Sequence, residues 1–75
     1  MIVINSYDEI KSKDIQVGEK FEIHKGKLMA TYKVIRSENF EDCYELLRCI
    51  DFHTNKHVTG CGSVVGCIQL AYDVT

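Results

Sequence analysis

The chain has 75 residues, of which 27% are charged, and a net charge of −2. This length predicts a single domain over residues 1–75, and so small a core often needs a metal, disulfides or a partner as an extra staple. The charge argues against a nucleic-acid binder that relies on excess basic residues. No apolar run approaches the ~20 residues of a membrane span. No signal peptide is recognisable, so we expect a cytoplasmic protein whose thiols stay reduced.

The charge is unevenly distributed along the chain. Residues 1–37 carry seven Lys and Arg against five acids, which gives +2, and residues 38–75 carry two against six, which gives −4. One interpretation is two ordinary solvated faces. The other is an acidic face that docks on a basic protein groove.

The first half of the chain is predicted to form short strands, interrupted by one short helical or loop segment. The apolar run over residues 1–4 predicts a strand, and the capping-box spacing that follows predicts one or two helical turns or a polar loop. Alternation over Lys20–His24 and the β-forming run Leu28–Arg36 predict two strands, joined by a hairpin at Gly26.

The second half is more ambiguous. Ser37 is placed to cap a short helix over residues 38–47, but a strand from Tyr44 to Phe52 is the preferred interpretation. A tight turn is expected over residues 53–57 and a returning strand after it. The segment Ile68–Val74 alternates between apolar and other residues, which predicts a closing strand.

These elements predict a mainly β or α+β fold. We expect a small antiparallel meander or curled sheet with at most one short helix, stapled by a structural zinc. The residues expected to face the core are Phe21, Ile23, Tyr32, Val34, Ile50, Val58, Ile68, Leu70 and Tyr72.

The four cysteines are arranged as a mirror about Asn55. Cys43 and Cys67 are equidistant from this centre, as are Cys49 and Cys61. A hairpin that turns at Asn55 would bring each pair face to face, but the pairs would lie about 20 Å apart along the strands. Glycines beside Cys61 and Cys67 offer places where the strand can bend.

Three interpretations of the cysteines stay open. The first is a structural zinc bound by Cys43, Cys49, Cys61 and Cys67. The second is a set of reduced thiols that act as small apolar core residues, and the third is two disulfides. His53 or His57 could replace a cysteine as a ligand. Four thiolates would close a zinc site against catalysis, and no other catalytic motif is recognisable, so we expect no enzyme.

The small size, the acidic second half and the cysteine set in "FEDCYELLRC…GCGSVVGC" resemble a group of phage-encoded inhibitors. The chain is similar to the anti-CRISPR proteins that act on type II effector nucleases, and specifically to a zinc-containing member. The resemblance covers the character of the chain and its cysteine pattern, because these inhibitors share no common motif.

The resemblance implies a non-enzymatic, zinc-binding inhibitor that binds a type II CRISPR effector nuclease and blocks target-DNA loading. The nuclease holds its heteroduplex in a basic channel. The partner-binding residues would be acidic: Glu38, Glu41, Asp42, Glu45 and Asp51. A net charge of −2 favours a protein-specific surface over full phosphate mimicry, and no direct contact with nucleic acid is expected.

An alternative function comes from a different class of protein. A small zinc-stabilised β-barrel module of a phage or bacterial operon would bind nucleic acid or a transcription complex. Its surface would be a basic stripe made of Lys11, Lys13, Lys25, Lys27 and Lys33.

Overall fold

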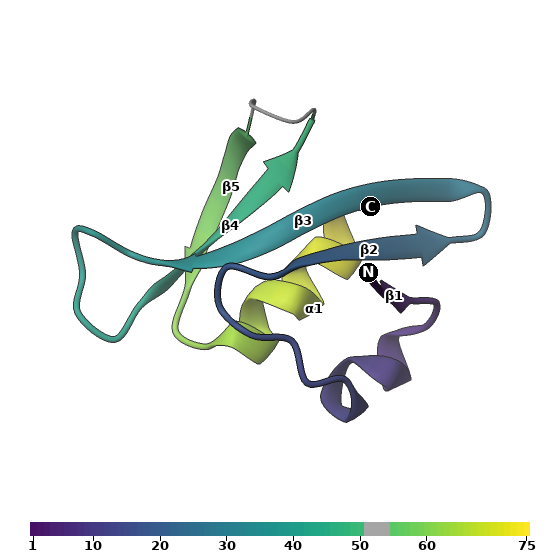
Figure 1. Ribbon diagram of the computed structural model, residues 1–75, viewed down its shortest axis with the longest axis horizontal. Coiled ribbons are helices and arrows are strands. Elements are labelled where there is room, and N and C mark those ends of the chain that lie inside the picture. Colours follow the sequence, from purple (N-terminus) through teal and green to yellow (C-terminus); the bar gives the residue numbers. More distant parts are fainter. Residues whose placement is uncertain (51–54) are drawn as a thin grey trace.

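The computed structural model describes residues 1–50 and 55–75, with the backbone alone at positions 55, 56, 59 and 61. Within these residues, a five-stranded sheet packs against one α-helix and one 3₁₀ helix (Figure 1). In chain order the elements are β1 (Ile2–Ile4), the 3₁₀ helix (Tyr7–Ser12), β2 (Lys20–Lys25), β3 (Leu28–Arg36), β4 (Tyr44–Cys49), β5 (Asn55–Cys61) and α1 (Val64–Val74).

The sheet is mixed, whereas the sequence predicted an antiparallel one. Strands β2 to β5 form an antiparallel meander in chain order, as expected, but β1 pairs with β2 in parallel. A parallel pair needs a crossover of about a dozen residues or more. The segment from Asn5 to Glu19 supplies that length, and its 3₁₀ helix buries Ile10 on the way.

The closing strand predicted over Ile68–Val74 is wrong, because this segment is helix α1. The Ser63 hydroxyl accepts a hydrogen bond from the Gly66 N–H at 2.9 Å and so caps the helix. The buried residues Cys67, Ile68 and Ala71 follow the three-to-four-residue spacing of a helix. The apolar residues from Ile68 onward therefore fit both a strand pattern and a helix pattern, and the chain adopts the helix.

The core lies between the sheet and the two helices. Of the predicted core residues, Phe21, Ile23, Tyr32, Val34 and Ile68 are buried, and Val58, Leu70 and Tyr72 pack partly buried against them. The prediction that Ile50 faces the core is wrong, because Ile50 follows the last residue of β4 and is 59% exposed. The sequence did not predict the burial of Ile4, Ile10, Ile15, Leu46, Cys67 and Ala71.

The C-terminal end of α1 is tied to the sheet by polar contacts. The Thr75 hydroxyl donates to the Ala71 carbonyl at 2.7 Å and accepts a hydrogen bond from the buried Tyr32 hydroxyl at 3.0 Å. The Lys25 ammonium donates to the Tyr72 carbonyl at 3.3 Å and lies 4.9 Å from the centre of its ring. A cation at this end of a helix is favoured by the helix dipole.

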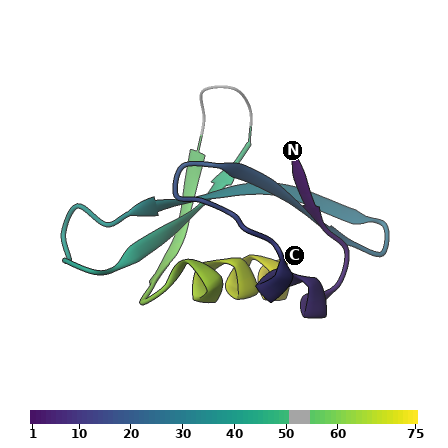
Figure 2. The ribbon, with the colours of Figure 1, turned by 60° about the horizontal axis from the view of Figure 1, so that its bottom comes forward.

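Both helices lie on one face of the sheet, and within the described residues no helix covers the other face (Figure 2). Successive side chains of a strand alternate between faces, so Lys33, Glu45 and Leu47 lie on the uncovered face, opposite to Val34 and Leu46. This uncovered face carries the candidate site.

Candidate binding surface

The register of β4 and β5 separates the mirrored cysteines. Cys49 pairs with Asn55, and Cys61 pairs with Tyr44. Asn55 is therefore a residue of β5, whereas the mirror required it to be the centre of the turn. A bulge also shifts the register by one residue between Leu46 and Leu47. Residues 53 and 54 of the predicted turn, and with them His53, lie outside the described residues.

The four cysteines occupy three different places in the fold. Cys43 precedes β4 and lies near Cys61, since Tyr44 pairs with Cys61. Cys49 is at the opposite end of β4, about 17 Å from Tyr44 at ~3.3 Å per residue. Cys67 is fully buried in the core on α1. Cys43 and Cys49 are not in disulfides.

A single tetrahedral zinc needs four sulfurs at about 2.3 Å from the metal. The extended β4 strand keeps Cys49 from sharing such a centre with Cys43 in the described fold. Among the side chains that the structure describes, no three His, Cys, Asp or Glu residues are grouped closely enough to hold a metal. The four-thiolate zinc would require a rearranged β4–β5 hairpin, and it stays a hypothesis for metal analysis.

The loop between β3 and β4, residues 37–43, is closed by hydrogen bonds from Ser37. The Ser37 N–H donates to the Cys43 carbonyl at 3.0 Å. The Ser37 hydroxyl accepts from the N–H groups of Asn39 and Phe40, each at 3.2 Å. This is the capping pattern that the sequence suggested for Ser37, but it stabilises a turn and no helix follows.

Asp42 completes the loop in the left-handed region, with φ of 60°. Aspartate tolerates this conformation better than most residues with a β-carbon. The conformation reverses the chain just before β4 begins at Tyr44. The loop is thus shaped by its own backbone and by Ser37.

The β3–β4 loop presents acids and one aromatic ring to solvent. Glu38, Glu41 and Asp42 are exposed, and Phe40 is 69% exposed. No described lysine or arginine comes within 4.0 Å of a carboxylate, since the two ion pairs found among the described side chains both use histidine. The structure therefore places three of the predicted partner-binding acids together without an internal cation, while Asp51 lies outside the described residues.

A hollow of about 480 Å³ lies beside this loop, on the uncovered face. Ser37, Asn39 and Phe40 line it from the loop, and Cys43, Tyr44 and Glu45 line it from the start of β4. The remaining wall comes from His57, Gly60 and Gly62. The volume falls within the ~300–1,000 Å³ typical of ligand pockets.

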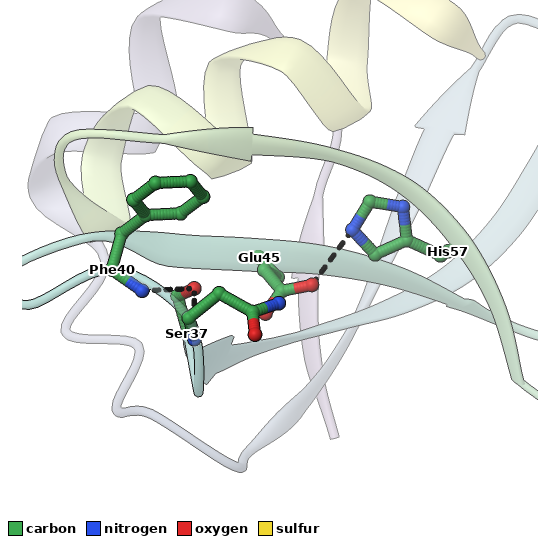
Figure 3. A network of polar contacts seen from close by, with 5 residues as sticks. Ser37, Phe40, Glu45 and His57 are labelled. Carbon is green, nitrogen blue, oxygen red and sulfur yellow. Dashed lines mark hydrogen bonds and ion pairs between the residues drawn. The ribbon is translucent and has the colours of Figure 1, made fainter.

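Glu45 and His57 form a polar pair in this hollow (Figure 3). His57 Nε2 lies 2.8 Å from Glu45 Oε1, and their side chains are 55% and 21% exposed, respectively. Glu45 was predicted from the sequence as a partner-binding acid, whereas His57 was considered only as a substitute metal ligand. The pair forms because the bulge in the β4–β5 ladder brings His57 opposite Leu47, diagonal to Glu45 on the same face.

The exposed Phe40 and the two glycines of the hollow were not predicted from the sequence. Phe40 is apolar and would ordinarily be assigned to a core. Its position in "SENFED", between polar and acidic neighbours, is the signal that places it in a loop.

The lysines of the alternative function do not form one stripe. Lys25 packs against α1, on the helix-covered side, and Lys33 lies on the uncovered face. Lys11 belongs to the 3₁₀ helix and Lys27 to the β2–β3 hairpin.

Comparison with protein-family models, with curated proteins and with solved structures finds no match to this chain. Among the described residues, no helix has the length and apolar character needed to cross a membrane.

Proposed function

We propose that the protein is a non-enzymatic binding module that docks the β3–β4 loop on a basic protein surface. The observation that carries this proposal is the exposed acidic loop, whose carboxylates have no lysine or arginine partner among the described side chains. From Arg36 to Glu45 the chain has one basic residue and four acids, a net charge of −3. Such a surface attracts a basic partner and speeds its association.

The partner that we propose is a type II CRISPR effector nuclease, with inhibition through failure of target-DNA loading. Two considerations support it: the resemblance of the chain to anti-CRISPR proteins, and the positive charge of the channel in which these nucleases hold nucleic acid. The inhibitor would act by occupying that channel, so it would be needed in stoichiometric amounts. Guide loading would survive, since the proposal concerns only the entry of target DNA.

The test compares two triple variants with the same change in charge. One variant neutralises the loop with Glu38→Gln, Glu41→Gln and Asp42→Asn, in which asparagine keeps the tolerance of left-handed backbone. The control carries Asp8→Asn, Asp14→Asn and Asp73→Asn at exposed positions outside the loop. Binding to the guide-loaded effector is measured by biolayer interferometry at several salt concentrations.

We expect the loop variant to bind at least tenfold more weakly and with less salt dependence, while the control changes less than threefold. Equal losses in the two variants would show that net charge alone matters and would refute the loop as the contact. Absence of binding by the unmodified protein would exclude this nuclease as the partner. Inactivation of the nuclease by substoichiometric protein would contradict a binding mechanism.

A further inference from the structure

We propose that the hollow between Phe40 and Glu45 accepts one arginine side chain of the partner. This inference rests on the proposed function in taking the partner to be a basic protein. It adds the specific group that is recognised. Three features of the site support it, namely the cavity, the aromatic ring at its rim and the carboxylate inside it.

The Glu45 carboxylate has an oxygen available for a ligand. A carboxylate has two oxygens that accept hydrogen bonds, and His57 engages Oε1 of Glu45. Among the described residues, Oε2 has no partner. The contact with His57 Nε2 holds this carboxylate in place through one of its oxygens. One oxygen of Glu45 is thus available to a second donor, in a site that is only partly open to water.

The Phe40 ring offers a surface on which a planar cation can stack. Phe40 lines the same hollow and is 69% exposed, so its ring is available to a ligand. In the view of Figure 3 the Glu45 carboxylate lies between the Phe40 ring and His57. A guanidinium is planar and weakly hydrated, so it can stack on an aromatic ring and donate N–H groups to a carboxylate at the same time. A lysine ammonium, which is more strongly hydrated and is not planar, fits this combination less well.

The hollow has room for an added side chain. Gly62 lines the hollow, and a β-carbon built there meets no heavy atom within 4 Å, so a side chain can be added at this position without a clash. Arg36 is not among the residues that line the hollow, and its guanidinium lies 5.8 Å from the centre of the Tyr44 ring. The hollow therefore has the charge and the ring for a guanidinium, and no lysine or arginine is among the described residues that line it.

The probe is N-acetyl-arginine amide, titrated into the full ¹⁵N-labelled chain and followed by amide chemical shifts. N-acetyl-citrulline amide is the matched control, since it keeps the planar shape and loses the charge. We expect saturable shifts at Phe40, Glu45 and His57 with millimolar affinity for the arginine probe, and at least tenfold weaker binding of the citrulline probe.

Three variants separate the contributions. Glu45→Gln removes the charge, Phe40→Leu removes the ring but keeps apolar bulk at an exposed position, and Gly62→Leu adds a bulky side chain to the wall of the hollow. Each should weaken arginine binding at least fivefold, whereas Leu28→Ala at an exposed site on the β2–β3 hairpin should not. Phe40→Leu keeps the test valid if either of the other variants fails to fold.

No saturable shift at the hollow, or equal binding of arginine and citrulline, would overturn the arginine site. If the loop variant still abolishes binding to the nuclease in that case, the proposed function stands without the arginine site. If the arginine probe binds but the nuclease does not, the site stands and the partner is a different arginine-bearing protein.

Discussion

Replacement of Ile68 by alanine tests the helix on which the fold depends. Ile68 lies on α1 and is 1% exposed, packed among the buried side chains of the sheet. Removal of its side chain beyond the β-carbon should cost about 2–5 kcal/mol, through lost burial and the cavity left behind. At ~0.05–0.15 kcal/mol per residue, a domain of this size has a total stability of only about 4–11 kcal/mol. The variant should therefore lose a large share of its stability.

The assay is urea unfolding followed by far-UV circular dichroism, with thermal unfolding in parallel. In a domain of this size 1 kcal/mol shifts the melting temperature by about 4–8 °C, so we expect a fall of at least about 8 °C. Val65→Ala is the matched control, because it also shortens a β-branched residue of α1 but at a position that is 40% exposed. Alanine favours a helix more than valine, so the control should be neutral or slightly stabilising.

The result that would refute the reasoning is a difference of less than about 0.5 kcal/mol between Ile68→Ala and Val65→Ala. A second comparison distinguishes the helix from a strand. On a strand, Val74 would share the inward face of Ile68, and Val74→Ala would be similarly costly. On α1, Val74 is half exposed at the C-terminal end, so Val74→Ala should cost less than about 1 kcal/mol.

Three further predictions concern other parts of the chain. Ser37→Ala removes the acceptor of two loop N–H groups and should speed amide hydrogen exchange at Asn39 and Phe40 several-fold, whereas Ser37→Thr should not. Unchanged exchange in Ser37→Ala would show that the hydroxyl does not stabilise the loop. Cys67→Ala should lower the free energy of unfolding by about 1 kcal/mol or more, and Cys49→Ala by clearly less, because only Cys67 is fully buried. Equal losses in the two variants, accompanied by release of one zinc per chain, would instead establish the four-thiolate site. Gly26→Ala should cost about 1 kcal/mol in urea unfolding because Gly26 has φ of 65°, and a neutral result would mean that the hairpin adopts another turn.

The sequence by itself determined the strands of the first half and part of the core. β2 and β3 are close to their predicted ranges, and the alternation that placed Phe21, Ile23, Tyr32 and Val34 inward is confirmed. This succeeded because a strand with one buried face has a period of two that neighbouring turns do not obscure. The acidic segment was also identified, because the distribution of charge along the chain follows directly from the sequence.

Only the tertiary structure decided the last segment and the hairpin register. The apolar residues after Ser63 satisfy both a strand pattern and a helix pattern, and the choice depends on the cap at Ser63 and on the open sheet face that the helix covers. In the hairpin, the register pairs Cys49 with Asn55 and Cys61 with Tyr44, so the two cysteines are not opposite each other as their spacing suggested. The register of a hairpin depends on where the chain turns and on how the buried faces match, so symmetry in the spacing of the cysteines could not show which thiols meet.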